Sequence, residues 1–589
     1  YRTVWQDAVP GRPLTADVLV VAPIEHRELA ETWARALDRL GASSTVMTLP
    51  ASGDLPLDLL EGGTSSRSLL VSLGTLPTGT GARPPINHAA ALGRLAAGGR
   101  QGRQLVFVTR DAVRSEVCDP DQAAVWGYAK TLGLEIPSCL AAILDVAPDV
   151  AADDVARVIL GCDGEDQWSL AAQGAFVPRI EACELPAGRG LAASGTVLIT
   201  GGTGGIGAAI AKEYAQAGAL RIALLSRRGP DAPGAQGLAQ ELQALGCEVE
   251  VVSCDVSNRG DLIRAVEDIE SHGDAITAVV HTAGTVEFAP IPEVDDAALA
   301  RMASGKVDGA RYLDEIFAGR RLDAFVVCSS VAATWGSGGQ AAYASANAWL
   351  DGLARRRRVR GETAHAIAWG PWGDHGMIEG DGVRETLLRR GLRLMDEASA
   401  LESFKRVLVG DEPCPVVASM DWVAFGRLIQ GERRRPFFER VIPVGDEPSA
   451  AAADRSLGDV LRGLPASERV ARCTVTIREI VAAVLGADDT QTLSLSVPFK
   501  DLGFDSLMAV DLRDQLRVKA GISVSSSVIY DYPNVVSLAA HVLQLLVPED
   551  ELADATPRGA LALDDIHDAV RDASTPELLE LIDSLTSRS

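Results

Sequence analysis

The stretch that decides the fold is residues 197–207, which read Val-Leu-Ile-Thr-Gly-Gly-Thr-Gly-Gly-Ile-Gly. A short apolar run leads into a glycine turn, and residues 208–214 follow at helical spacing, so a strand, a tight turn and a helix are expected in that order. Gly202, Gly204 and Gly207 have the G-x-G-x-x-G spacing, which suits a backbone that approaches a pyrophosphate at a helix N-terminus. The stretch predicts a dinucleotide site, and a glycine turn without a ligand is the alternative.

Three more expected strands, at residues 221–226, 248–253 and 278–281, end in small or polar residues. The first of them ends before Arg227 and Arg228, where NAD enzymes have an acidic residue, and guanidinium groups there favour the 2′-phosphate of NADP(H). Two solvated arginines are the alternative. The cofactor site expected at this sheet edge comprises Thr200, Gly202, Thr203, Gly204, Gly205, Ile206, Gly207, Ser226, Arg227, Arg228, Asp255, Val256, Ala283 and Gly284.

Composition excludes several classes of protein. The 589 residues carry a net charge of −25 and no basic stripe, which argues against a nucleic-acid binder. Nine cysteines without C-x-x-C pairs or His/Cys clusters predict a reducing compartment and no metal site. No signal peptide or membrane-spanning run is recognised, so a soluble cytoplasmic protein is expected. The chain begins with Tyr1 and not with Met, which predicts a piece of a longer polypeptide.

The chain is expected to contain two α/β units and a smaller helical domain. Residues 1–190 have strands at 17–22, 68–72 and 104–109 but no glycine loop, so this first unit has lost a cofactor site. The fold class is therefore α/β, with two Rossmann-like doubly wound subdomains, the first degenerate and the second NADPH-binding. A small four-helix-type domain and a helical tail follow.

A serine and a tyrosine in the second unit are candidates for catalysis. Ser330 ends an expected strand at residues 325–330, and Tyr343 begins an expected helix 13 residues later. Such a pair can converge on one carbonyl oxygen, although a loop serine and a surface tyrosine are the alternative. Residues 415–422 are expected to form the last strand of this unit.

These residues resemble the short-chain dehydrogenase/reductases, and more closely the ketoreductase domains of modular type I polyketide synthases. The superfamily has a lysine four residues after the tyrosine, whereas this chain has Asn347 there and Lys306 upstream. That exchange is typical of polyketide and animal fatty-acid synthase ketoreductases. Residues 1–190, including Ala-Val-Trp-Gly-Tyr-Ala-Lys at 124–130, resemble the family's degenerate structural subdomain.

The resemblance implies NADPH-dependent reduction of a β-ketoacyl thioester. Tyr343 would donate a proton to the ketone oxygen and Ser330 would hydrogen-bond it. A nearby ammonium that favours the phenolate helps a phenol whose ordinary pKa is about 10, and Lys306 is the candidate. Asn347 would help to hold that lysine.

The resemblance also implies a stereochemical outcome. Residues 284–290 contain no Leu-Asp-Asp motif, and Trp335 lies eight residues before the tyrosine, as in A-type ketoreductases that form an L-hydroxyl. Gln340 stands where a histidine is expected when an epimerised substituent is preferred, so the A1 subtype is predicted. A packing role for the tryptophan is the alternative.

The last part of the chain resembles an acyl carrier protein followed by a docking segment. Ser506 lies in Leu-Gly-Phe-Asp-Ser-Leu, the motif whose serine carries 4′-phosphopantetheine, and a helix cap is the alternative. After residue 546 the chain is acidic, and an amphipathic stripe suits a docking helix, with a frayed tail as the alternative. The stripe consists of Leu578, Leu579, Ile582 and Leu585.

The expected organisation is the C-terminal part of a synthase module. Its parts are a ketoreductase structural subdomain (1–190), a catalytic subdomain (191–445), a linker (446–460), a carrier protein (461–545) and a docking segment (546–589). The expected partners are an upstream ketosynthase and acyltransferase, the next synthase polypeptide and a phosphopantetheinyl transferase, with a homodimer in the full module. The alternatives are a redox-inactive epimerase or scaffold domain, and a carrier module whose α/β part merely binds nucleotide.

Overall fold

The computed structural model divides the chain into two compact units, Tyr1–Val444 and Gly445–Ser589. It describes all residues except 50–54, 57–58, 61–66, 78–83, 98–102, 163, 189–190, 192, 374–383, 385–386, 389, 430–434, 443–456, 486–492, 503, 505, 517–519, 521, 523, 525–527 and 548–589. Each unit is described by itself below. No helix in the described part of the chain is both long and apolar enough to cross a membrane.

The first sheet of the N-terminal unit is built from residues 2–181. Its strand order is β1-β8-β7-β6-β5-β4-β2-β3, parallel from β3 to β7 and antiparallel at β8 and β1. The strands are β1 (Arg2–Asp7), β2 (Asp17–Ala22), β3 (Ser43–Thr48), β4 (Ser68–Ser72), β5 (Gln104–Thr109), β6 (Leu140–Val146), β7 (Gln167–Ala171) and β8 (Gly174–Glu181). The helices are α1 (Arg27–Arg39), α2 (Pro85–Ala97), α3 (Pro120–Glu135) and α4 (Ala152–Gly161). After β2 the chain enters a 3-10 turn at Ile24–His26, so the glycine loop is absent as expected.

The second sheet has the strand order β11-β10-β9-β12-β13-β14-β16, which is the Rossmann arrangement extended by one strand. The strands are β9 (Thr196–Thr200), β10 (Arg221–Ser226), β11 (Glu248–Ser253), β12 (Ile276–His281), β13 (Ala324–Ser330), β14 (His365–Trp369) and β16 (Val416–Val417). The helices around it are α5 (Gly205–Gln216), α6 (Ala235–Ala244), α7 (Arg259–Ser271), α8 (Asp296–Ala303), α9 (Gly309–Ile316), α11 (Ala341–Val359) and α13 (Glu397–Val407).

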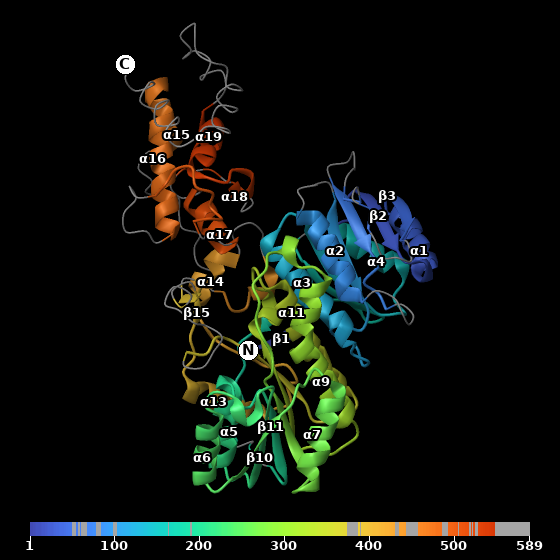
Figure 1. The fold of residues 1–589 in the computed structure, drawn as a ribbon. Helices are drawn as coiled ribbons and strands as arrows, with labels where there is room; N and C mark the ends of the chain where they lie inside the picture. Colours follow the sequence, from blue (N-terminus) through green and yellow to red (C-terminus); the bar gives the residue numbers. More distant parts are fainter. Residues whose placement is uncertain are drawn as a thin grey trace. The chain divides into compact units, whose positions relative to one another are not determined.

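Alternating strand residues explain why helices cover both faces of this sheet. Leu198 packs in one core with α7, α9 and α11, while its neighbours Val197 and Ile199 pack in another with α5, α6 and α13. Figure 1 shows α5 and α6 on one side of β10 and β11, and α7 and α9 on the other. The prediction of a doubly wound Rossmann-like subdomain is confirmed.

The expected last strand at residues 415–422 is corrected by the structure. Val416–Val417 pairs with β14, but β17 (Ser419–Met420) pairs with β15 (Leu392–Arg393) in a separate sheet, and α14 (Trp422–Ile429) begins at Trp422. The reason is that the Trp422 ring packs on Tyr1, with centroids 5.2 Å apart, and its indole N–H donates to the Tyr1 hydroxyl. These contacts favour burial of the ring over continuation of the strand.

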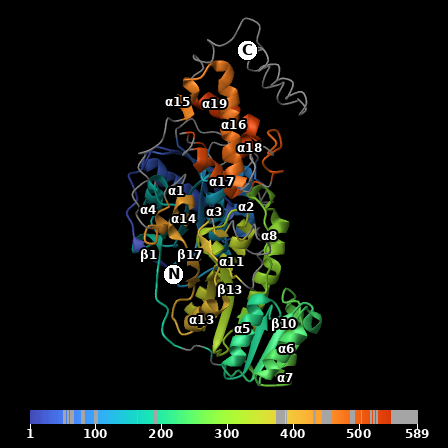
Figure 2. The same cartoon turned by 90° about the vertical axis from the view of Figure 1, so that its left-hand side faces the viewer.

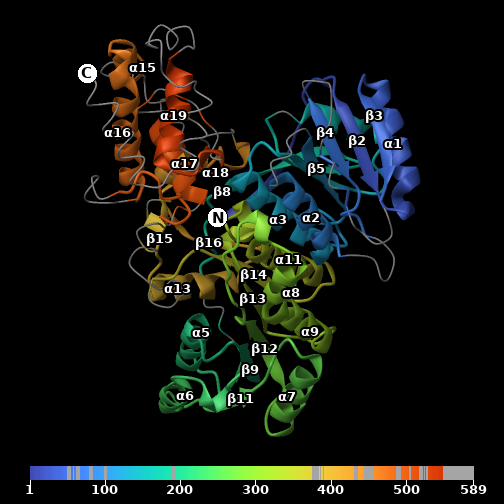
Figure 3. The same ribbon diagram turned by 45° about the horizontal axis from the view of Figure 1, so that its top comes forward.

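Helices α3 and α11 join the two sheets into one unit and lie side by side (Figures 1 and 3). A Cβ on Gly127 would lie 2.3 Å from the Ala344 carbonyl oxygen, and one on Gly352 would lie 2.8 Å from the Pro120 Cα. Glycine on each helix therefore permits this close approach. The helix that carries Tyr343 consequently packs directly on the first subdomain.

The second unit is a small helical domain. Its helices are α15 (Leu457–Arg462), α16 (Ala466–Leu485), α17 (Ser506–Gln515), α18 (Val528–Asp531) and α19 (Val535–Leu546), and α16 runs beside α19 (Figure 2). The linker was expected to end at residue 460, and α15 begins at Leu457. Leu457 and Leu461, four residues apart on one face, are both buried in this core. The expected docking helix lies outside the described residues.

Candidate active site

The glycine loop joins β9 to α5 through a turn that excludes larger side chains. Gly201 has a φ of +66°, and a Cβ on Gly207 would lie 2.5 Å from the Gly201 carbonyl oxygen. Gly204 caps α5 without a side-chain hydrogen bond, and Gly204 and Gly205 are exposed. The first N–H groups of α5 therefore have no side-chain acceptor from the cap, and the loop fits a dinucleotide pyrophosphate.

The neighbouring strand ends supply the other expected cofactor residues. Ser226 ends β10, and its buried Oγ has no hydrogen-bond partner among the described residues. Arg227 and Arg228 follow it and are exposed. Beyond β11, the Asp255 carboxylate accepts hydrogen bonds from the backbone N–H and the hydroxyl of Ser257, at 3.0 and 2.7 Å. The unpartnered hydroxyl and the two guanidinium groups fit a phosphorylated ribose.

His281, which the sequence analysis placed only in a strand, connects the cofactor loop to Lys306. Its Nδ1 lies 2.7 Å from the Thr200 hydroxyl and its Nε2 lies 2.9 Å from the Lys306 carbonyl oxygen. A carbonyl can only accept, so Nε2 donates and Nδ1 accepts from Thr200. Burial lowers the pKa of His281 to about 4, which keeps the ring in this neutral form. The Thr200 side chain, expected in the cofactor site, is therefore bound to His281.

Lys306 is buried on a π-helical turn, η4 (Ser304–Asp308), between α8 and α9. Its Nζ donates to the Cys328 carbonyl oxygen at 3.0 Å and lies 5.6 Å from the centroid of the Tyr343 ring. A Cβ on Gly284 would lie 2.8 Å from the Lys306 Cε, so glycine leaves room for the lysine stem. Burial lowers the pKa of Lys306 to about 8, against the opposing effects of Cys328 and Asp351.

Ser330, Tyr343 and Asn347 meet where β13 ends and α11 begins. Ser330 caps α10 (Val331–Trp335) by accepting the Ala332 N–H at 3.2 Å, which leaves its hydroxyl proton able to donate elsewhere. Asn347 donates from Nδ2 to the Tyr343 carbonyl oxygen at 2.8 Å. Burial raises the pKa of the half-buried Tyr343 phenol, while hydrogen bonds with the Ser330 and Asn347 side chains lower it.

Asp351 is a second residue that the sequence analysis missed. It is buried on α11, two turns after Tyr343, and burial raises its pKa to about 6. Arg355, the Ser329 hydroxyl, and the charges of Lys130 and Lys306 act in the opposite direction. A carboxylate here offsets part of the charge of the buried lysine. Its one sequence signal is a lone acid within Trp-Leu-Asp-Gly-Leu at 349–353.

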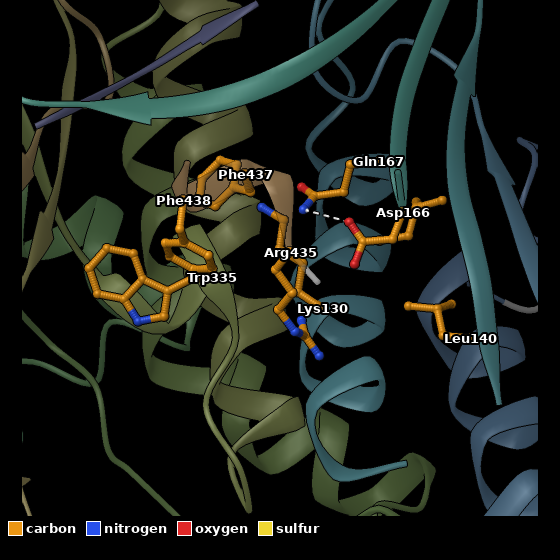
Figure 4. A pocket seen from close by; sticks show the side chains of 9 residues that line it. Lys130, Leu140, Asp166, Gln167, Trp335, Arg435, Phe437 and Phe438 are labelled. Carbon is orange, nitrogen blue, oxygen red and sulfur yellow. Dashed lines mark hydrogen bonds between the residues drawn. The ribbon is translucent and has the colours of Figure 1, made fainter. Parts of the chain in front are cut away.

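The side chain of Trp335, expected to mark the direction of substrate entry, is buried. Its ring lies 6.0, 5.7 and 6.3 Å from those of Trp422, Phe425 and Phe438. It also borders a cavity about the size of one water molecule, together with Lys130 and Arg435 (Figure 4). Gln340 is half-buried and immediately precedes α11.

The expected attachment serine, Ser506, is the first residue of α17. Leu512 on that helix and Leu516 just after it are buried in the domain core, and Met508 packs against the core, so these residues at i, i+4 spacing share one face. The helix therefore begins at the position that the carrier motif requires. Asp505, expected beside the serine, lies outside the described residues.

Three family models match the chain in the order of its domains. Residues 10–180 match the polyketide synthase extender module SpnB Rossmann fold domain, and residues 195–374 match the KR domain. Residues 475–542 match the phosphopantetheine attachment site. The matches follow the order degenerate subdomain, catalytic subdomain and carrier.

The chain is also similar to two curated synthases and to a solved ketoreductase structure. The chain is 37% identical over 75% of its length to erythronolide synthase EryA3 of Saccharopolyspora erythraea, of which it spans 14%. It is 34% identical over 96% of its length to pikromycin polyketide synthase component PikAIII of Streptomyces venezuelae, of which it spans 38%. A solved structure titled "Structure of A1-type ketoreductase" is 32% identical, with a TM-score of 0.67, and the match covers 75% of this chain and 97% of that one.

Proposed function

The chain belongs to the ketoreductase family of modular polyketide synthases, and we propose that it reduces a β-ketoacyl thioester carried by its own phosphopantetheine arm. In the proposed reaction the ketone becomes a β-hydroxyl group and NADPH becomes NADP⁺. The hydride adds to the β-carbon and a proton adds to its oxygen, so the atoms and electrons balance. The thioester bond to the carrier stays intact.

One observation carries this proposal. The buried amine of Lys306 lies 5.6 Å from the Tyr343 ring, although the two residues come from different elements. A phenol beside a lysine and within hydrogen-bonding reach of a serine is an arrangement that suits proton donation to a carbonyl oxygen. The same arrangement argues against the redox-inactive alternative, because all four expected catalytic residues are present. They are Ser330, Tyr343, Lys306 and Asn347.

In this mechanism each residue has a distinct task. Tyr343 donates its phenolic proton to the ketone oxygen, and the Ser330 hydroxyl donates a hydrogen bond to the same oxygen while the charge develops. Protonated Lys306 lowers the cost of leaving a phenolate. Asn347 bonds to the backbone of Tyr343 and so holds the start of α11 in place.

Two groups of residues would bind two different parts of NADPH. The turn at residues 201–207 and the N-terminus of α5 would hold the pyrophosphate, and Ser226, Arg227 and Arg228 would hold the 2′-phosphate. When bound, the reduced dinucleotide supplies the hydride. Asp255, Val256, Ala283 and Gly284 complete the expected set along the carboxyl ends of β11 and β12.

We propose that the product has the L configuration and that the enzyme is of the A1 subtype. The support is the absence of Leu-Asp-Asp from residues 284–290, the presence of Trp335, and glutamine at position 340. The similarity to a structure titled as an A1-type ketoreductase is consistent with this assignment. Chiral chromatography of the product checks it, and a D-hydroxyl would refute it.

The remaining proposals concern the module. Residues 1–190 and 191–445 would be the structural and catalytic ketoreductase subdomains, the carrier would extend to 545 with 4′-phosphopantetheine on Ser506, and 546–589 would dock. The partners would be a phosphopantetheinyl transferase, upstream ketosynthase and acyltransferase domains, and the next polypeptide, in a homodimeric module. The chain spans 14% and 38% of the length of the two relatives named above.

Replacing Tyr343 by Phe tests the function directly. We expect NADPH oxidation with a soluble β-ketoacyl thioester to fall by about 10²-fold or more, because the general acid is lost. The Kd for NADPH, measured by fluorescence titration, should stay unchanged. Tyr312→Phe on α9 is the matched control, since Tyr312 is a partly buried tyrosine that packs against the same core and belongs to no expected site. Near wild-type turnover in Tyr343→Phe would refute the mechanism, and an inactive wild type would favour the redox-inactive alternative.

A further inference from the structure

Glu135, the last residue of α3 in the first subdomain, binds two loops of the catalytic subdomain. Its Oε1 accepts the Gly339 N–H at 2.7 Å, and its Oε2 accepts the Ile291 N–H at 3.0 Å. The side chain is half-buried, and no cation lies within ion-pair distance of it among the described residues. The carboxylate is therefore held by backbone donors from two segments that are 48 residues apart in sequence.

The preceding turn of α3 strengthens this attachment. Thr131 accepts the Ser337 N–H at 3.2 Å, and Lys130 donates to the Ala333 carbonyl oxygen at 3.1 Å. Gly336 has a φ of +86°, and a Cβ there would lie 2.9 Å from the Lys130 carbonyl carbon. Residues 333–339 consequently run in close contact with the end of α3.

The two loops also bind each other. The Ala289 N–H donates to the Gly339 carbonyl oxygen at 2.8 Å, and Ala289 forms an isolated bridge with Gln340. Glu135 binds the Gly339 N–H on the same peptide segment, so its carboxylate completes a three-way junction. An amide in place of the carboxylate would bring an NH₂ group against one of the two backbone donors.

The two loops of this junction lead to residues that are expected in the active site. The first loop begins at Gly284, which packs on Lys306, and the second leads into α11, which begins two residues before Tyr343. The first loop also exposes Phe288, which is 69% accessible and whose ring carbon would lie 3.8 Å from a Cβ on Gly339. The junction thus holds the backbone beside Phe288 against the segment that leads into α11 and Tyr343.

We propose that Glu135 is a positioning residue that holds the loops at 284–291 and 333–340 in register with Tyr343, and so determines which face of the ketone receives the hydride. The inference rests on the proposed reductase function. The inference gives Glu135, which lies in the first subdomain, a role in the stereochemistry of a reaction that takes place in the second. The physical reason is that small displacements of a substrate-facing loop change the relative barriers of the two approaches.

The test compares Glu135→Ala and Glu135→Gln with Asp121→Ala in the full chain. Asp121 also joins α3 to the second subdomain, by accepting the Trp349 indole N–H at 2.7 Å, but it lies at the other end of α3. The readouts with a soluble β-ketoacyl thioester are the ratio of major to minor hydroxyl configuration, kcat, KM and the Kd for NADPH. A general loss of stability lowers the amount of active protein, but it does not change the ratio of major to minor hydroxyl configuration.

We expect Glu135→Ala to lower the ratio of configurations by about tenfold and to raise KM, with a smaller change in Glu135→Gln and none in Asp121→Ala. The Kd for NADPH should stay within about twofold of wild type, because the glycine loop is not touched. An unchanged ratio in both Glu135 variants, or an equal loss in Asp121→Ala, would overturn the inference. If Glu135→Ala fails to bind NADPH, the ratio of configurations measured for Glu135→Gln tests the inference in its place. A wild type that forms no hydroxyl product would instead refute the proposed function.

Discussion

At the scale of single residues, the buried amine of Lys306 changes its charge close to physiological pH. Burial lowers its pKa to about 8, and Cys328 and Asp351 oppose that shift. Below this pH the amine is protonated and favours the Tyr343 phenolate, and above it the assistance is lost. The rate of reduction should therefore fall as the pH rises through the pKa of Lys306.

The prediction at this scale concerns Lys306→Met. Wild-type kcat should be flat below pH 8 and decline above it, following the pKa of about 8. In the variant kcat should be about 10²-fold lower, because no ammonium group is present to favour the Tyr343 phenolate. The decline above pH 8 should also disappear, because no amine at position 306 can lose a proton. Steady-state kinetics across the pH range measure both effects. Lys405→Met, which removes an ion pair with Glu213 on α5, is the control. A decline near pH 8 that persists in Lys306→Met would contradict the assignment.

At the scale of elements, the strand–turn–helix of β9 and α5 depends on where glycine is sterically required. A Cβ on Gly207 would meet backbone atoms of Gly201 and Gly202 at 2.5 and 2.9 Å, and neither can move aside as a flexible side chain could. Gly237 on α6, in contrast, has nothing within 4 Å of the equivalent position. The two glycines therefore separate the effect of crowding from the effect of backbone entropy.

Gly207→Ala should weaken NADPH binding by about tenfold to a hundredfold, because overpacking of this kind costs about 1–3 kcal/mol. Gly237→Ala should leave the Kd unchanged and stabilise the protein by about 0.5–1 kcal/mol, as expected for alanine in an open helical site. Fluorescence titration with NADPH and thermal unfolding measure the pair. Equal behaviour of the two variants would show that the turn does not need glycine at 207.

At the scale of the whole molecule, the chain contains independent cores on either side of residue 445. The core of the second unit draws only on residues 457–547, and the described cores of the first unit draw on none of them. Within the first unit the situation differs, because α3 residues such as Ala124 pack in the same core as α11 and the second sheet. The two sheets should therefore fold together.

Cutting the chain at 444/445 should yield two folded fragments with separate thermal transitions. Residues 1–444 should reduce a soluble β-ketoacyl thioester with unchanged kcat, whereas reduction of a ketone loaded on the carrier should weaken because the tether supplies a local concentration of about millimolar. Intact mass spectrometry of the loaded carrier follows the reaction, with Ser506→Ala as the unloaded control. A fragment of residues 191–444 should not fold. A single transition in the intact chain, or an inactive 1–444, would contradict this division.

Local rules determine the features that could be predicted from sequence alone. Apolar strand runs, the turn glycines and helical spacing depend on neighbouring residues, so the two α/β subdomains and the glycine loop at 201–207 could be predicted from the chain itself. The candidate cofactor and catalytic residues were likewise named from motif and resemblance. Their roles remain predictions.

Tertiary structure alone decided which distant residues touch. His281 links Thr200 to Lys306, Asp351 accompanies the buried lysine, and Glu135 reaches from the first subdomain to two loops of the second. Trp335 is buried among aromatic rings that come from residues 422–438. These contacts join segments far apart in the sequence, and hydrophobic periodicity says which face of an element is buried but not which partner covers it. That is why the chain's own pattern predicted the elements and the candidate residues, whereas only the packed fold determined the side chains that position them.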